Sequence, residues 1–336
     1  MTWVWVVGLV LAAFATRWGA EQLAAPLKAV RQRYGFTGAA GGPLVALGSA
    51  SPDVGINVVS AATGAGAVGL GSMLGSTVVS IPITVAVGYA AFRKNRATSD
   101  KKPAEQGEGL RIEKSAVLID ALPYLAVVAL FAVLILPPAW RGLQPIDGLI
   151  AVVAYVIYLG QALFRGRGGE RGQVSWSGKQ TLLTLGGVAA LAVGSYVLVT
   201  GTQQIGSALG LAPLVSGLFI TAFMTALPQV FTTWSVVRSG QVTSGITSVF
   251  ADHTFTLAVL PLAIVTVPVQ NYPVVLTVMA FVALMPVLFA VLSYRRERHD
   301  SYGFILRDVV MLGGALIAYL LCTAAVLFFL AGASGR

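Results

Sequence analysis

Charged residues are scarce in this chain, and their scarcity excludes most soluble folds. Asp, Glu, Lys and Arg make up 10% of the 336 residues, whereas apolar side chains make up 56%. A soluble protein carries about 25% charged residues, which hydrate its surface. A disordered chain or a long coiled coil is excluded as well, because each needs polar or heptad-patterned sequence. The composition therefore predicts an integral membrane protein.

Cysteine, histidine and several catalytic motifs are also rare or missing. The chain has one cysteine, Cys322, and two histidines, so it has no internal disulfide and no cluster typical of zinc or copper. The sequence contains no phosphate-binding loop, no His-Glu-x-x-His and no Gly-x-Ser-x-Gly. These absences argue against an ATP-driven pump, a zinc protease and a serine hydrolase. We expect Cys322 to pack within a helix and expect no resident cofactor.

Long apolar runs are what the chain does have. A bilayer core needs about 20 apolar residues per helix, and ten runs of suitable length follow one another. They cover residues 3–18, 36–63, 65–92, 116–140, 146–164, 181–199, 212–236, 242–267, 272–294 and 304–331. The first run has no basic segment before it, so we do not expect a cleaved signal peptide.

The basic residues orient these runs. With ten spans, 20 of the 22 Lys and Arg residues fall on one side, and only Arg141 and Arg336 fall on the other. Because short cytoplasmic loops are rich in Lys and Arg, both termini are expected outside and the loop between spans 5 and 6 in the cytoplasm. The location expected is a cytoplasmic membrane, with the lipid bilayer rather than nucleic acid explaining the positive charge. The sequence indicates no protein partner and no oligomeric state.

Two parts of the chain carry the same kind of interrupted apolar segment. The regions 41–80 and 217–256 are rich in Gly, Ser, Thr and Pro. Aligning Pro52 with Pro228 shifts the sequence by 176 residues and pairs oxygen-bearing side chains without a gap. The pairs are Ser49 with Thr225, Asp53 with Gln229, Ser76 with Asp252, and Ser80 with Thr256.

This duplication predicts the fold. An odd number of spans in each half inverts the second half relative to the first, and matched interruptions point to a transporter site at mid-membrane. We expect an all-α polytopic membrane protein whose ten transmembrane helices form two inverted-topology five-helix repeats. The repeats are residues 1–165 and 180–336, with a cytoplasmic linker at 166–179. Pro52 and Pro228 are expected to break their helices and free backbone carbonyls.

The motifs resemble those of the calcium/cation antiporter superfamily, the membrane region of sodium/calcium exchangers. Its repeats carry a G-[TS]-S-x-P-[ED] motif, read here as Gly48-Ser49-Ala50-Ser51-Pro52-Asp53, followed by a G-N-x-x-G-S-N-like motif at 71–77. The second repeat keeps Thr225 and Pro228 but has Gln229 where the family has an acid. Asp252 stands where the family has a serine. The resemblance implies that one acid has moved to the neighbouring helix.

Eight oxygen-bearing residues form the expected cation site. A carboxylate inside the membrane costs a few kcal/mol and usually has a function, and hard oxygen ligands suit Na⁺ or Ca²⁺. The expected ligands are Ser49, Asp53, Ser76, Ser80, Thr225, Gln229, Asp252 and Thr256. The two carboxylates balance one Ca²⁺, two Na⁺ or two H⁺, so the transported pair stays open.

His253, Asp120 and Asp308 are polar residues that are not among the expected ligands. His253 either packs as a hydrogen-bonded side chain or accepts a proton coupled to cation exchange. Asp120 and Asp308 are expected at the membrane interface. The resemblance also implies fewer or weaker cation subsites, since Ser80 and Thr256 replace the family's Asn or Asp.

The function expected is secondary antiport of Ca²⁺ or another cation against Na⁺ or H⁺ by alternating access. Three alternatives stay open. In the first, the chain is a degenerate family member that conducts cations or only binds them. In the second, its two aspartates form an intramembrane protease. The protease is disfavoured because Gly69-Leu70-Gly71-Ser72 lacks the acid of a Gly-x-Gly-Asp motif. In the third, Pro and Ser only kink and pack the helices.

Overall fold

The computed structural model describes residues 2–34, 47–97, 109–135, 142–165, 177–257, 267–268, 272–295 and 301–334. Within these residues the chain is helical apart from two pairs of short strands. The Gly-Gly-Pro sequence at 41–43, the polar residues 100–108 and most of the expected linker, 166–176, lie outside the described residues.

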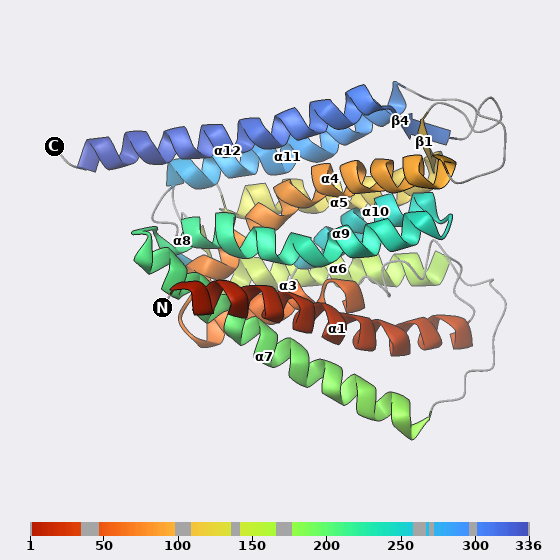
Figure 1. Cartoon of the computed structure of the whole chain (residues 1–336), viewed down its shortest axis with the longest axis horizontal. Coiled ribbons are helices and arrows are strands. Elements are labelled where there is room, and N and C mark those ends of the chain that lie inside the picture. Colours follow the sequence, from red (N-terminus) through yellow and green to blue (C-terminus); the bar gives the residue numbers. More distant parts are fainter. Residues whose placement is uncertain are drawn as a thin grey trace.

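The helices run roughly along one direction (Figure 1). A short helical segment at 47–49 precedes α3. The helices are α1 (Thr2–Tyr34), α3 (Ser51–Ala62), α4 (Gly66–Ala97), α5 (Lys114–Ile135), α6 (Pro145–Arg165), α7 (Gly178–Ala208), α8 (Pro213–Ser216), the π-helical turn η2 (Gly217–Thr221), α9 (Ala222–Arg238), α10 (Val242–Leu257), α11 (Tyr272–Tyr294) and α12 (Leu306–Ser334).

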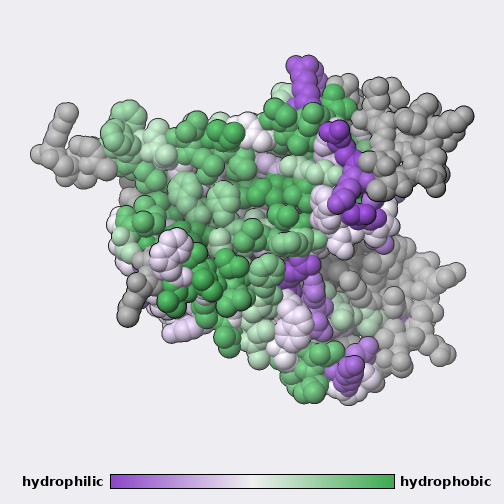
Figure 2. All heavy atoms as spheres, in the orientation of Figure 1, coloured by the Kyte–Doolittle hydropathy of each residue, from purple (hydrophilic) through white to green (hydrophobic). Residues whose placement is uncertain are grey.

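Six of the described helical segments are long and apolar enough to cross a membrane. They are Trp3–Leu27, Gly66–Asn95, Gly178–Ala208, Pro213–Arg238, Tyr272–Tyr294 and Leu306–Leu330. Most of the surface in view is hydrophobic, and hydrophilic residues gather mainly toward the end that carries β1 and β4 (Figure 2). α1 begins and α12 ends at the opposite end (Figure 1).

The first helix is longer than expected. The apolar run expected from the sequence ends near Trp18, but α1 continues to Tyr34, and the part of it that is long and apolar enough to cross a membrane reaches Leu27. The residues after Trp18 are mainly Ala, Leu, Glu, Gln, Lys and Arg, which favour helix. The helix therefore outlasts the apolar run, and Arg17 lies inside the helix rather than at its end.

Helix α4 is the centre of the molecule. In its apolar window 83% of the residues are buried, against 17% in the window of α12. Glycines let α8, η2 and α9 approach it closely. A Cβ on Gly71 would lie 2.2 Å from the Leu214 carbonyl oxygen, and one on Gly75 would lie 2.6 Å from that of Leu218. These glycines of the second motif therefore serve helix packing, as small residues do in membranes.

Helices α1 and α7 form a closely packed pair. A Cβ on Gly19 would meet the Gly187 carbonyl oxygen at 2.5 Å, and one on Gly194 would meet Thr16 Cγ2 at 2.6 Å. α7 begins with a capping box, in which Ser177 Oγ accepts from the Gln180 amide and Gln180 Oε1 accepts from the Ser177 amide.

The two strand pairs join the halves of the chain. β1 (Leu110–Glu113) pairs antiparallel with β4 (Ser301–Phe304), with Leu110 opposite Phe304. β2 (Gly142–Leu143) pairs antiparallel with β3 (Val267–Pro268). β3 starts 157 residues after β1, and β4 starts 159 residues after β2. Each pair thus contains one strand from each half, and the two strands of the first half recur in the second half after nearly the same number of residues.

Candidate functional site

The first predicted interruption lies just before α3. Residues 47–49 are helical, Ala50 forms a turn, and α3 starts at Ser51 with Pro52 in its first turn. Pro52 has no amide hydrogen to donate to the Gly48 carbonyl. The Ser51 hydroxyl donates to that carbonyl instead, at 2.7 Å. The expected break at Pro52 is confirmed, and a side chain satisfies the freed carbonyl.

The second predicted interruption differs. We expected Pro228 to break its helix, but α9 runs through Pro228 from Ala222 to Arg238. That expectation was wrong, because a single proline inside a long packed helix removes only one backbone hydrogen bond. The irregular turn in this segment is instead η2, whose Gly217 lies against α4: a Cβ there would be 2.2 Å from the Val68 carbonyl oxygen.

Two side-chain hydrogen bonds join residues of the two halves. Ser49 Oγ donates to Asp252 Oδ1 at 2.5 Å, and Thr256 Oγ1 approaches Asp53 Oδ2 at 3.4 Å. The Thr256 hydroxyl also donates to the Asp252 carbonyl at 2.9 Å. Each carboxylate therefore meets a hydroxyl from the opposite half. Four of the eight predicted site residues lie together in one cluster.

Two buried oxygens at this cluster and on α9 have no hydrogen-bond partner among the described residues. They are Asp53 Oδ1 and Gln229 Oε1. A buried carboxylate or amide oxygen without a partner is costly, and such exceptions need an explanation such as an ion or water. These oxygens are available as cation ligands.

The other four predicted ligands lie on α4 and α9, and two of them make hydrogen bonds within their own helix. Ser76 Oγ donates to the Met73 carbonyl at 3.1 Å, and Thr225 Oγ1 donates to the Ala222 carbonyl at 3.0 Å. Ser76 and Ser80 are both buried in α4. A hydroxyl that donates to its own helix keeps lone pairs on its oxygen, which a cation can use.

His253 is buried, and neither ring nitrogen has a hydrogen-bond partner among the described residues. The expectation of a hydrogen-bonded, packed histidine is therefore met only for its packing. Its role in proton coupling stays a prediction.

Asn57 belongs to the same neighbourhood, although the motifs did not single it out. It lies one helical turn after Asp53, and its Nδ2 donates to the Asp53 carbonyl at 2.8 Å. Its Oδ1 is buried without a partner in the described part of the chain. The sequence signal that could have identified Asn57 is an amide four residues after an intramembrane acid, on the same helix face.

Two acids at helix starts have a structural role. Asp308 Oδ2 accepts from the Ile305 amide at 3.0 Å at the start of α12, and Asp147 Oδ2 accepts from the Gln144 amide at 2.9 Å at the start of α6. Both acids lie in first turns, where a carboxylate stabilises the helix. The side chain of Asp120 is outside the described part.

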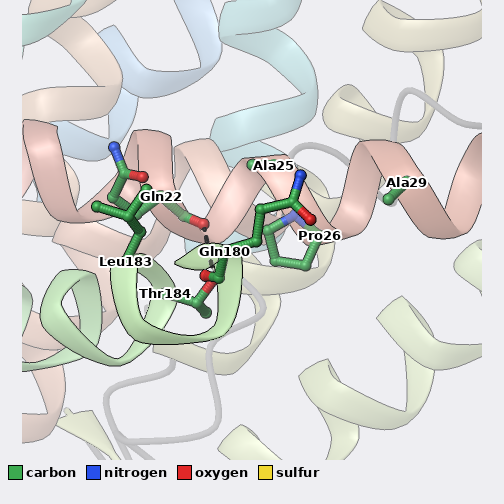
Figure 3. A pocket seen from close by; sticks show the side chains of 7 residues that line it. All are labelled: Gln22, Ala25, Pro26, Ala29, Gln180, Leu183 and Thr184. Atoms are coloured by element: carbon green, nitrogen blue, oxygen red, sulfur yellow. Dashed lines mark hydrogen bonds between the residues drawn. The ribbon is translucent and has the colours of Figure 1, made fainter. Parts of the chain in front are cut away.

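A small pocket lies away from this cluster, between α1 and α7 (Figure 3). It is lined by Gln22, Ala25, Pro26, Ala29, Gln180, Leu183 and Thr184. Pro26 leaves the Gln22 carbonyl without its helical partner, and Thr184 Oγ1 approaches that carbonyl at 3.5 Å (Figure 3). Pro26 is thus one of the residues that line the pocket, and none of these residues belongs to the predicted site.

The donor atoms of the cluster are all oxygen. Among the described residues there is no group of three or more His, Cys, Asp or Glu side chains placed to hold a metal ion. Two carboxylates with hydroxyls and amides match hard, weakly held cations better than zinc or copper. This chemistry suits an ion that binds and leaves.

Comparison with known proteins bears on the family and the fold of the chain. The model of the sodium/calcium exchanger protein family matches residues 2–164 and 179–331. No curated protein matches the chain. The sodium-calcium exchanger NCX_Mj, soaked with 2.5 mM Na⁺ and 10 mM Sr²⁺, is 17% identical with a TM-score of 0.61. That match covers 96% of this chain and 99% of the other.

A structure of the sodium/calcium exchanger from Methanococcus jannaschii is 20% identical with a TM-score of 0.58, over 95% of this chain and 99% of the other. At these identities the structures establish the shared fold, whereas the family match spans nearly the whole chain. The resemblance seen in the motifs is confirmed, and the protein is a cation antiporter of the secondary-transporter class rather than an enzyme. The chain belongs to the sodium/calcium exchanger protein family.

Proposed function

We propose that the chain exchanges Ca²⁺ or another cation against Na⁺ or H⁺ by alternating access at the cluster around Asp53 and Asp252. One observation carries the proposal. Two hydrogen bonds, Ser49 to Asp252 and Thr256 to Asp53, link the acid of each half to a hydroxyl of the other. The proposed ligands are Ser49, Asp53, Ser76, Ser80, Thr225, Gln229, Asp252 and Thr256.

The charge of the cluster suits exchange. Two carboxylates balance one divalent cation, two Na⁺ or two protons, so either loaded form carries no uncompensated charge into the membrane. An uncompensated charge there costs several kcal/mol. A site that is neutral with either cargo can therefore change its exposure from one side of the membrane to the other.

The strand pairs support the proposed inverted repeats of five helices each. β3 starts 157 residues after β1, and β4 starts 159 residues after β2, so the two strands of the first half correspond to the two strands of the second half. Because β1 pairs with β4 and β2 pairs with β3, exchanging the halves converts one pair into the other. Equivalent contacts made twice, with the halves exchanged, are what a two-fold relation between repeats produces.

We further propose that the protein lies in a cytoplasmic membrane with its termini outside. The hydrophilic end in Figure 2 is the end opposite to the start of α1 and the end of α12. That end carries β1, which lies within residues 93–114, a stretch with seven Lys and Arg residues, and basic loops favour the cytoplasm. A channel remains the second candidate function, because the second half has Gln229 where the family has an acid.

Moving the acid from position 252 to position 229, where the family has one, tests the assignment of the site residues. We expect Asp252→Ser to lose at least about 90% of exchange, since one carboxylate is worth at least about 1.4 kcal/mol of cation binding. Adding Gln229→Glu to this variant returns one acid to the site and is expected to restore much of the exchange. The measurement is uptake of radioactive calcium into proteoliposomes, driven by an outward Na⁺ gradient or by a pH gradient.

Gln229→Glu alone is the matched control, and it is expected to exchange more slowly because three acids hold a divalent cation too tightly. Full exchange by Asp252→Ser would contradict the assignment of Asp252. Calcium uptake that needs neither gradient, and that carries net current, would favour the channel. Comparing the two gradients identifies the counter-ion.

The hydrogen bond from Ser49 gives a smaller test. Ser49→Ala removes the donor to Asp252 but leaves both acids, so the apparent calcium affinity is expected to fall by about threefold to tenfold. The same uptake assay, run over a range of calcium concentrations, measures it. Ser244→Ala, which changes an exposed serine on α10, is the control and is expected to leave the affinity unchanged.

A further inference from the structure

Arg17 lies inside the stretch of α1 that is long and apolar enough to cross a membrane, Trp3–Leu27. At 1.5 Å per residue, Arg17 lies about 21 Å from one end of this stretch and about 15 Å from the other. A charged side chain at this depth is expensive and usually functional. The ion site described above does not use it.

The side chain of Arg17 connects α1 to α9. Its Nη1 donates to the Pro228 carbonyl at 3.3 Å, and its guanidinium carbon lies 5.5 Å from the centre of the Phe231 ring. Phe14, one turn earlier on α1, contacts the same ring at 5.7 Å between centroids. Three contacts therefore fix one short stretch of α9 against α1.

That stretch is next to the ion site. Pro228 directly precedes Gln229, whose buried Oε1 has no partner among the described residues. On the other half, a Cβ at Gly48 would lie 2.7 Å from Ala24 Cα, so α1 also touches the residue before Ser49. α1 thus contacts the chain immediately beside one proposed ligand in each half.

The guanidinium acts through position rather than through its charge. Its Nε pairs with Glu21 Oε1 at 2.9 Å on the same helix, and this pair is neutral as a whole. It therefore leaves the two negative charges of the ion site in place. A guanidinium also presents several donors in a fixed plane, so it can bind Glu21 and the Pro228 carbonyl at the same time.

We propose that Arg17 is a positioning residue of the exchange site, which holds the Pro228 carbonyl and thereby sets the position of the Gln229 amide. The inference rests on the proposed function. A lysine at this position keeps the charge and reaches one acceptor, whereas a glutamine keeps only a weak donor. Both replacements change the packing around position 17, but only lysine keeps a charged donor. A difference between the two variants therefore reports on the positioning of the Pro228 carbonyl.

The test compares the KM for calcium with the maximal rate in proteoliposomes. Arg17→Gln is expected to raise KM about tenfold, the effect of losing one charge-assisted hydrogen bond, with a smaller change in maximal rate. Arg17→Lys is expected to recover most of this loss. Lys94→Gln is the matched control: Lys94 also lies over an aromatic ring, that of Trp234 at 5.7 Å, but away from Gln229, and KM should not change.

A second readout separates this inference from the proposed function. The calcium-dependent rise in Tm of the purified protein measures binding without transport, and Arg17→Gln should need about tenfold more calcium for the same rise. An unchanged calcium dependence in both assays would overturn the inference while leaving the exchanger intact. If the wild type binds calcium but does not exchange it, the proposed function fails and the Tm assay still decides on Arg17.

Phe231→Leu covers the case in which Arg17→Gln does not fold. It removes the ring under the guanidinium, and Phe231 is exposed, so the fold should tolerate it. We expect it to raise KM about threefold, since a cation–π contact at an exposed site is weaker than a charged hydrogen bond. An unchanged KM in Phe231→Leu, together with a folded protein, would also overturn the inference.

Discussion

Asp53→Asn is expected to abolish cation exchange while leaving the protein folded. Asparagine has the same shape and can still accept the hydroxyl of Thr256, which approaches Asp53 Oδ2 at 3.4 Å. It lacks the negative charge, and removing one partner of a buried ion pair costs about 3 kcal/mol or more, or more than about 100-fold in affinity. Initial rates of gradient-driven calcium uptake measure the effect.

Asp308→Asn is the matched control for this variant. Asp308 is also a buried acid, but it accepts the Ile305 amide at the start of α12. Asparagine caps a helix almost as well as aspartate does, so transport should stay near the wild-type rate. Equal losses in both variants would mean that a buried acid matters only for folding, and undiminished exchange by Asp53→Asn would remove Asp53 from the site.

Gly71→Ala is expected to destabilise the folded protein strongly. A Cβ at this position would lie 2.2 Å from the Leu214 carbonyl oxygen and 2.9 Å from the Leu218 amide nitrogen. Both are backbone atoms of the segment that packs on α4, so neither can move aside as a flexible side chain does. Overpacking of this kind costs about 3 kcal/mol, measured by thermal unfolding of the purified protein in detergent.

Gly313→Ala provides the comparison. Gly313 also lies in a long helix, α12, but a Cβ there has nothing within 4 Å. Alanine favours helix over glycine by about 1 kcal/mol, so this variant should unfold at the same temperature as the wild type or slightly above it. A Gly71→Ala protein as stable as Gly313→Ala would mean that the contact between α4 and α8 is looser than described.

The motifs predicted which residues meet better than they predicted the shapes of the helices. Aligning Pro52 with Pro228 selected Asp53 and Asp252, and the structure links each to a hydroxyl of the opposite half. Polar side chains stand out in an apolar run, because placing a polar or charged group in the membrane costs free energy and such groups usually have a function. A pattern of this kind can therefore be recognised in a single sequence.

The backbone details could not be recognised in the same way. Pro228 lies inside a continuous helix and the irregular turn is at Gly217–Thr221, since neighbouring helices decide where a strained backbone is tolerated. The strands β1 to β4 have two to four residues each, too few to give a periodic signal. The apolar run 3–18 puts Arg17 next to the end of the first predicted span, because hydropathy follows apolar runs, whereas helices continue into polar sequence.

The two strand pairs have a consequence for how the molecule is assembled. Each half of the chain supplies one strand to each pair, so a half produced alone would display two open strand edges. It would also hold a single acid without the hydroxyl that meets it. Each half therefore depends on the other for its strand partners and for the hydroxyl that meets its acid. Fragments that correspond to the two halves should accumulate as folded protein only when both are expressed together.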